Sequence, residues 1–160
     1  MRRLAHLIGL IALTVAGATA HASSAVAVVE WRDLMPNGER PPLPLFGHPG
    51  TSIELDIPEQ KPDFRTNSAV LNQFVRIEGF AVPLDMEGGK VRRLLLVPFF
   101  GACIHLPPPP PNQIIDVTLA QPMRLPDLYA PVSVEGLLIA ERSQTELAGT
   151  AYIVRDGTLH

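Results

Sequence analysis

Prolines are the feature of this chain that most restricts its fold. The 160-residue sequence contains 17 of them, and seven lie between residues 36 and 62. Five more form an uninterrupted run at residues 107–111. Because proline lacks a backbone N–H and blocks helix continuation, neither stretch can hold a long helix or a central strand. We therefore predict an irregular, proline-rich arm over residues 23–68.

Beyond the arm, the sequence divides into short segments with the character of β-strands. Residues 74–82 (FVRIEGFAV) alternate apolar and polar side chains at first, which is the period of a half-buried strand. Further apolar runs follow, separated by glycine, proline and aspartate. The predicted strands are 74–82, 91–100, 113–119, 132–140 and 151–154.

Helices are expected only as short pieces, at residues 68–73 and 143–147. Two predicted strands carry the same dipeptide, Glu78-Gly79 and Glu135-Gly136. Glycine inside a strand indicates a bulge or a sharp bend. Together these patterns predict a mostly β protein, with a small five-stranded barrel of the OB type over residues 69–160. A β-sandwich is the alternative architecture.

Composition excludes several classes of protein. The chain is 46% hydrophobic and 18% charged, which excludes intrinsic disorder. Its net charge of −3 argues against nucleic-acid binding through phosphate contacts. Its single cysteine excludes an internal disulfide, a four-cysteine zinc site and a CxxC redox pair.

The first 22 residues have the pattern of a secretory signal peptide. Arg2 and Arg3 precede an apolar stretch at residues 7–17, and small residues follow it. Cleavage is predicted after Ala22, with Ala20 as the alternative site. The apolar stretch is shorter than the roughly 20 residues of a membrane-spanning helix, which disfavours a permanent anchor. We therefore expect a soluble periplasmic protein without stable membrane insertion.

The segment that can carry chemistry contains Cys103 and His105. In an extended strand, side chains two residues apart leave the same face, with Cα atoms roughly 6.5 Å apart. A thiolate and an imidazole on one face can share a zinc or copper(I) ion, which both ligand types suit. The proline run that follows would stiffen the approach to Asn112 and Gln113. These residues predict a transition-metal site at Cys103 and His105, with Asn112 and Gln113 in a loop that contacts a partner.

Other interpretations of this segment remain open. Cys103 is also the kind of residue that fills a small space in a core, and His105 can hydrogen-bond a loop carbonyl. A Cys–His nucleophilic pair is a third interpretation, although its base usually comes from a distant element. Sequence spacing does not choose a third metal ligand. The candidates are His48, His160, Glu78, Asp85, Asp116 and Glu135.

The same motifs carry a family resemblance. Residues 75–84 (VRIEGFAVPL), residues 94–100 (LLLVPFF), the Gly-Ala-Cys-Ile-His sequence at 101–105, the proline run and Asn112-Gln113 resemble the bacterial DUF3299 family. Its members are small exported proteins or lipoproteins of uncharacterised function. The resemblance extends from Trp31 to near the C-terminus. Unlike the lipoprotein members, this chain has no cysteine near the predicted cleavage site.

What the resemblance implies about function is an accessory role outside the cytoplasm. Some relatives are encoded beside ABC-type export systems and metal-responsive genes, which implies metal handling together with a transport system. We therefore expect a non-enzymatic periplasmic protein that binds zinc or copper(I) through Cys103 and His105. The alternative is a structural module that docks on a component of the transporter without a metal. A thiol-dependent enzyme is the third possibility.

Overall fold

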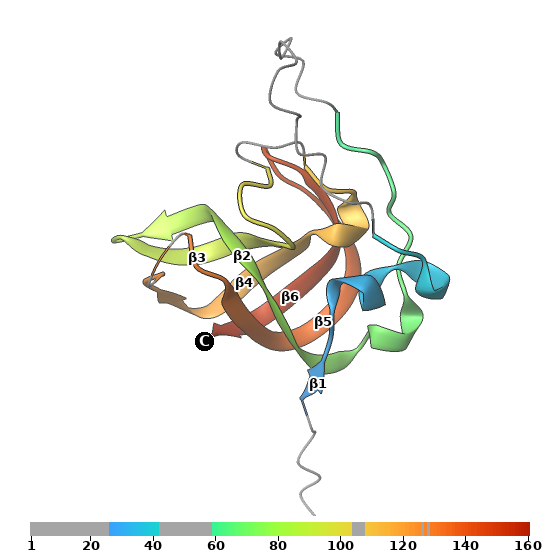
Figure 1. Ribbon diagram of the computed structural model, residues 1–160. Helices are drawn as coiled ribbons and strands as arrows, with labels where there is room; N and C mark the ends of the chain where they lie inside the picture. The colour runs from blue at the N-terminus through green and yellow to red at the C-terminus, as the bar shows by residue number, and fades with distance from the viewer. Residues whose placement is uncertain (1–25, 42–58, 104–107, 126, 128) are drawn as a thin grey trace, which may run out of the picture.

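The strands form one sheet that closes into a barrel (Figure 1). The computed structural model describes residues 26–41, 59–103, 108–125, 127 and 129–160. The sheet order is β1-β2-β3-β4-β6-β5, and β5 pairs back onto β2. Five strands therefore complete the barrel, and the short β1 adds to its outside. The strands are β1 (Ala27–Val28), β2 (Gln73–Glu87), β3 (Lys90–Val97), β4 (Ile115–Met123), β5 (Val132–Gln144) and β6 (Gly149–Leu159).

This topology confirms the predicted mostly β, five-stranded OB-like barrel. The pairings β2–β3, β3–β4, β2–β5 and β5–β6 are antiparallel, whereas β4 and β6 run parallel. The strand β2 is long enough to pair with both neighbours in succession. Its first half pairs with β5 up to Gly79, and its second half pairs with β3 from Phe80 onward. The barrel closes at this change of partner.

Several element boundaries differ from the predictions. The strand β3 ends at Val97 rather than at residue 100, because Pro98 has no N–H to continue the ladder. Gln113, predicted as the first residue of a strand, instead ends the 3-10 turn η4 (Pro111–Gln113), and β4 begins at Ile115. The predicted helix at 143–147 is wrong, because β5 continues to Gln144 and pairs there with Gly149. The predicted helix at 68–73 is reduced to the turn η3 (Ser68–Val70).

The two strand glycines lie where the sheet changes direction. Gly136 falls between Glu135 and Leu137, where the β5–β6 register shifts. At Gly79, β2 changes its pairing partner, and the backbone of β3 comes very close. A Cβ atom at Gly79 would lie 2.7 Å from the Val97 carbonyl oxygen. The expectation of a bulge or bend at these positions therefore agrees with the structure.

Apolar side chains pack on both faces of β3. Leu94 and Leu96 belong to the cluster inside the barrel. The intervening Leu95, together with Val97, belongs to a second cluster that includes Ala102 and Ile114. Alternate residues of a strand face opposite sides, so Leu95 and Val97 point to the outer face of the sheet. Ala102, in the segment after β3, packs against them there. The residue Cys103 lies on this outer cluster.

The described parts of the N-terminal arm, residues 26–41 and 59–68, lie against the barrel (Figure 1). They contribute β1, which pairs in parallel with β2, and the 3-10 turns η1 (Trp31–Leu34) and η2 (Pro36–Gly38). Leu34 of this arm is fully buried in the barrel cluster. In the described part of the chain, no helix is long and apolar enough to cross a membrane. The predicted signal peptide at residues 1–22 lies outside the described residues.

Candidate functional site

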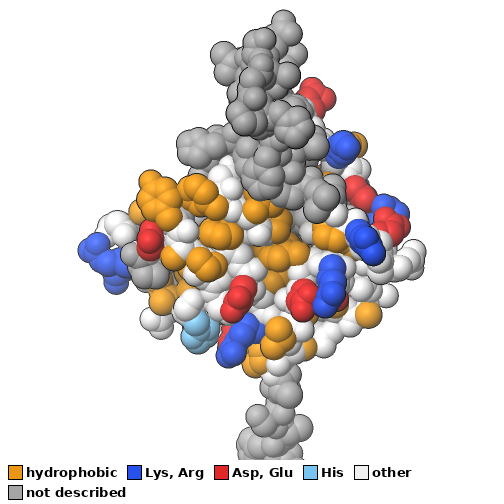
Figure 2. Space-filling model, viewed as in Figure 1, with side chains coloured by type: hydrophobic (Ala, Val, Ile, Leu, Met, Phe, Trp, Pro, Cys, Tyr) orange, Lys and Arg blue, Asp and Glu red, His pale blue; other side chains and the backbone are white. Residues whose placement is uncertain are grey.

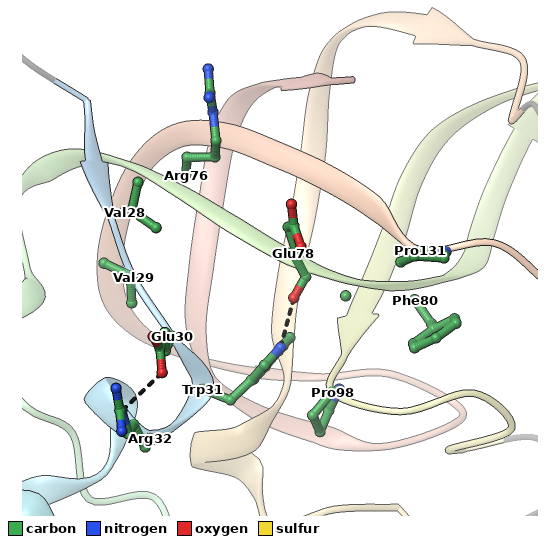
Figure 3. Close-up of a pocket in the computed structure, with 11 residues that line it drawn as sticks. Val28, Val29, Glu30, Trp31, Arg32, Arg76, Glu78, Phe80, Pro98 and Pro131 are labelled. Carbon is green, nitrogen blue, oxygen red and sulfur yellow. Dashed lines mark hydrogen bonds and ion pairs between the residues drawn. The ribbon is translucent and has the colours of Figure 1, made fainter.

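A groove of about 720 Å³ lies between the arm and the barrel (Figure 3). We call it the β1 groove. The strand β1 and the turn η1 form one side, and β2 runs along the other. Two prolines, one after β3 and one before β5, stand at its end. The lining residues are Val28, Val29, Glu30, Trp31, Arg32, Arg76, Glu78, Gly79, Phe80, Pro98 and Pro131.

Trp31 is held in the groove by the backbone of β2. Its indole Nε1–H donates a hydrogen bond of 2.7 Å to the Glu78 carbonyl oxygen, drawn as a dashed line in Figure 3. The indole ring also lies against the backbone of Gly79, where a Cβ atom would come within 2.9 Å of Trp31 Cζ2. A glycine is therefore needed at position 79 for Trp31 and β3 to approach β2 together.

Aromatic side chains extend the apolar surface beyond the groove. Phe80 meets Phe100 edge to face with ring centroids 6.1 Å apart, and Phe100 lies 5.3 Å from the ring of Tyr129. Phe100 is 46% exposed and Tyr129 is 73% exposed. Figure 2 shows apolar side chains gathered across the upper left and centre of the face that it views, with charged side chains below them and to their right. Exposed aromatic clusters of this kind are typical of protein-interaction surfaces.

The charges at the groove are not fully matched. Glu30 pairs with Arg32 at 2.9 Å, and Arg76 pairs with Glu135. The carboxylate of Glu78 is exposed and makes no ion pair within the described part of the chain. The unmatched charge of the β1 groove is therefore negative.

Asn112 and Gln113 fasten the arm to the barrel. Both side chains are buried, with exposures of 0% and 1%. Asn112 Nδ2 donates to the Arg65 carbonyl oxygen at 3.1 Å, and Gln113 Nε2 donates to the Trp31 carbonyl oxygen at 3.0 Å. Their amide groups thus bind other parts of this chain. The structure gives both residues an internal role, next to the groove that Trp31 lines.

Tyr152 holds the arm from inside the barrel. Its hydroxyl donates to the Leu34 carbonyl oxygen at 2.6 Å and accepts from the Asn67 N–H at 2.8 Å. One buried side chain of β6 therefore links two separate segments of the arm. Burial raises the pKa of this hydroxyl, and the bond from Asn67 opposes the shift. The hydroxyl consequently stays protonated and able to donate at neutral pH.

Cys103 does not lie in an extended strand. Its φ is 65°, in the left-handed region, and it forms part of a turn. The extended backbone assumed for Cys103 is therefore wrong, because the chain turns after packing Ala102 onto the outer cluster. The spacing rule for strand side chains does not apply at this position. His105 lies outside the described residues.

The Cys103 thiol is partly buried against apolar side chains. This burial raises its pKa to about 12, from 9.0. The thiol is therefore protonated at neutral pH, whereas the thiolate is the form that acts as nucleophile or metal ligand. A metal would have to displace the proton from this sulfur on binding.

The other predicted ligands are dispersed. Asp116 is engaged with Arg93 at 2.6 Å and with the hydroxyl of Ser143 at 2.7 Å. Glu135 pairs with Arg76, and His160 Nε2 lies 3.7 Å from Glu135 Oε2. Across the residues that the structure describes, no three His, Cys, Asp or Glu side chains are grouped to hold a metal ion. His48 lies outside that part of the chain, and Asp85 and Glu78 are exposed on β2.

A smaller polar cleft of about 200 Å³ lies on another side of the barrel. Its centre is the buried carboxylate of Asp116, which accepts two hydrogen bonds from Arg93 and one from Ser143. Arg155 and Glu141 pair with each other at its edge. Because these groups satisfy one another, the cleft has the character of a structural ion-pair network.

The β1 groove was not predicted from the sequence. Trp31 was a visible signal, since a lone tryptophan beside a run of prolines marks a place where an arm can anchor. Phe80 and Phe100 meet because β2 pairs with β3, with Phe80 opposite Val97. Tyr129 precedes β5, whose pairing with β2 closes the barrel. The bond from Trp31 to Glu78 likewise spans 47 residues.

Comparisons with known proteins agree with the resemblance in the motifs. Residues 31–160 match the family described as "Protein of unknown function (DUF3299)". The comparison with curated proteins gave no match. Among solved structures, the chain is similar to the crystal structure of a DUF3299 family protein from Pseudomonas aeruginosa PAO1. The identity is 32%, the TM-score is 0.72, and the match covers 85% of this chain and 97% of that one.

The family model therefore spans both the arm from Trp31 onward and the strands of the barrel. Trp31 and Arg32, which line one side of the β1 groove, fall within this match. The chain belongs to the DUF3299 family.

Proposed function

We propose that this protein is an exported, periplasmic accessory protein that acts by docking on another protein, without catalysis. The β1 groove is the docking site. A component of an ABC-type transport system is the partner that the family resemblance favours. The observation that carries the proposal is the exposed aromatic surface of Phe80, Phe100 and Tyr129, continuous with the groove beside β1.

The character of this surface supports docking in preference to reaction chemistry. The groove is lined mainly by apolar side chains, prolines included, and its charged side chains are exposed to solvent. Aromatic side chains that are partly exposed contribute strongly when a partner removes them from water. The thiol of Cys103 is neutral at physiological pH, which does not suit a nucleophile.

Site-specific photocrosslinking in cells tests this proposal. A photoreactive phenylalanine analogue at Phe100 or Val28 should form an adduct with one exported or membrane-attached protein. The same analogue at Arg155, which lines the polar cleft, serves as the control. The captured protein, once purified, should bind the wild type and lose about tenfold or more in affinity for Phe100→Ala. Equal adducts at all three positions, or an affinity unchanged by Phe100→Ala, would contradict the proposal.

A second candidate function is transition-metal binding at Cys103 and His105. It is favoured by one specific observation, which is that the single thiol of the chain is free and sits in a turn two residues before the histidine. Zinc and copper(I) are the ions that a thiolate and an imidazole suit.

Alkylation of Cys103 tests the metal site through the state of its thiol. Without metal, the reaction should be slow at pH 7 and should keep accelerating above pH 9, because the raised pKa keeps the thiol protonated. If zinc binds, it should protect Cys103 in the wild type but not in His105→Ala. Equal alkylation rates with and without zinc at micromolar concentration would remove this candidate.

A further inference from the structure

The exposed aromatic surface of the proposed docking site is formed by two segments that the sheet brings together. Val132, at the start of β5, pairs with Gly79 of β2, which brings the residues before β5 to this part of β2. Tyr129 comes from that segment and contacts Phe100, which follows β3, with ring centroids 5.3 Å apart. Because Tyr129 is 73% exposed, most of its side chain is open to a partner.

A carboxylate lies beside this pair of rings. Asp127 is exposed, and its Oδ1 accepts a hydrogen bond of 2.8 Å from the backbone N–H of Tyr129. Among the residues described, Asp127 makes no ion pair. The arginine nearest to it in the sequence, Arg124, has its guanidinium by the β2–β3 turn, where a Cβ atom at Gly89 would lie 3.9 Å from Nη1. The charge of Asp127 is therefore unmatched within the described chain.

The docking surface as a whole favours a basic partner. Both arginines that line the β1 groove, Arg32 and Arg76, are already paired with glutamates. The carboxylate of Glu78 in the groove has no ion-pair partner in the part of the chain that the structure describes. With Asp127 at the aromatic end, the described residues of this surface present two unmatched carboxylates and no unmatched cation.

An arginine is the side chain that suits an aromatic ring next to a carboxylate. Its planar guanidinium stacks on the face of the ring and donates hydrogen bonds to the carboxylate, whereas the ammonium of lysine is a compact point charge. The chain itself contains an arginine stacked in this way, because the Arg142 guanidinium lies 4.7 Å from the centroid of the Phe64 ring. Tyrosine and arginine are also the residues that most often dominate the binding energy of an interface.

Resting on the docking function proposed above, we infer that the partner is a protein that places an arginine at the Tyr129 end of the docking surface. The guanidinium stacks on the exposed ring of Tyr129 and pairs with the carboxylate of Asp127. An apolar side chain next to that arginine covers Phe100. The carboxylate of Glu78 adds a longer-range attraction for the same basic surface.

The test uses peptides selected from a displayed library of random 12-residue sequences against the full-length exported protein. Selected peptides should carry an arginine next to an apolar residue. Replacing that arginine by citrulline, which keeps its shape and removes its charge, should lower the affinity about tenfold. Lysine at the same place should recover only part of the loss, because it does not stack and pair at once. These substitutions are made in the peptide, so the folding of a protein variant does not affect them.

Variants of the protein locate the arginine. Asp127→Asn keeps an oxygen that accepts from the Tyr129 N–H and removes only the charge. In this variant, the loss caused by citrulline should shrink to about threefold, because only the stacking remains. Asp85→Asn is the matched control at an exposed carboxylate elsewhere on β2, and it should leave the tenfold loss in place. Tyr129→Leu should weaken binding about tenfold, whereas Tyr129→Phe keeps the ring and should change it less than about twofold.

The outcomes separate this inference from the docking function. If Phe100→Ala weakens peptide binding but citrulline or lysine in place of the arginine does not, docking stands and the arginine is refuted. Equal losses from citrulline in the wild type and in Asp127→Asn would place the arginine elsewhere and overturn the inference. If no selected peptide depends on Phe100, both proposals fail. If the protein alone forms a dimer that Tyr129→Leu dissociates, the occupant is a second copy and the inferred partner is overturned.

Discussion

In Tyr152→Phe, the free energy of unfolding is expected to fall by about 2–4 kcal/mol. The substitution keeps the ring in the core and removes only the hydroxyl. The Leu34 carbonyl oxygen and the Asn67 N–H then lose their partner, at 2.6 and 2.8 Å respectively. Buried polar groups without partners cost more than the hydrogen bond itself contributes. Denaturant unfolding, followed by circular dichroism, measures the change.

Tyr129→Phe provides the matched control for this prediction. The chemical change is the same, but Tyr129 is 73% exposed and its hydroxyl makes no hydrogen bond among the described residues. Its effect should stay within about 0.5 kcal/mol, as for most surface substitutions. Equal effects of the two substitutions would show that Tyr152 does not hold the arm.

The second large effect is expected for Gln113→Ala, at about 2–4 kcal/mol of unfolding free energy. Gln113 is 1% exposed, and its amide donates to the Trp31 carbonyl oxygen at 3.0 Å. Truncation leaves that oxygen without its donor and opens a cavity under the arm. Trp31 is the only tryptophan of the chain, so its fluorescence reports on the arm directly. A red shift of the native emission should accompany the loss of stability.

Gln144→Ala is the control for Gln113. The Gln144 side chain is exposed, and its amide nitrogen bonds to the neighbouring Thr145 carbonyl oxygen. We expect no shift of Trp31 emission and little change in stability. An unchanged emission in Gln113→Ala would contradict the role assigned to Gln113 beside Trp31.

These two predictions concern the construction of the β1 groove. One of its sides is the arm, and the arm is held by single side chains that reach from the barrel. Tyr152 binds it at Leu34 and Asn67, and Gln113 binds it at Trp31. A variant that loosens the arm should therefore also weaken docking, even though neither side chain lines the groove.

The fold was predictable because its signals are local. Alternation in residues 74–82 and the proline boundaries identified strands and an irregular arm, and five short strands pointed to a barrel. The strand ends were less predictable. Strand pairing across the barrel extends β5 to Gln144, which no nearby residue signals. Likewise, β6 continues past Asp156 with a φ of 52°, at a residue whose turn signal predicted an end to the strand.

The candidate site was less predictable, because it depends on contacts between distant residues. The metal site at Cys103 was predicted from a local sequence pattern. That prediction assumed an extended strand, but Cys103 lies in a turn. The sequence motif drew Asn112 and Gln113 into the predicted loop, but their hydrogen-bond partners at Arg65 and Trp31 lie 47 and 82 residues away. The contact between Phe80 and Phe100 depends on the β2–β3 register, which sets Phe80 opposite Val97, and no spacing rule indicates it.

Chemical-shift mapping tests the central claim most directly, namely that partners dock in the β1 groove. The partner protein captured by photocrosslinking is titrated into the isotopically labelled protein, and the backbone amides and the single indole N–H are followed. The largest changes should occur at Val28, Gly79, Phe100 and the Trp31 indole, with little change at Arg93 and Asp116. Changes centred on the polar cleft or on Cys103, with the Trp31 indole unmoved, would contradict the claim.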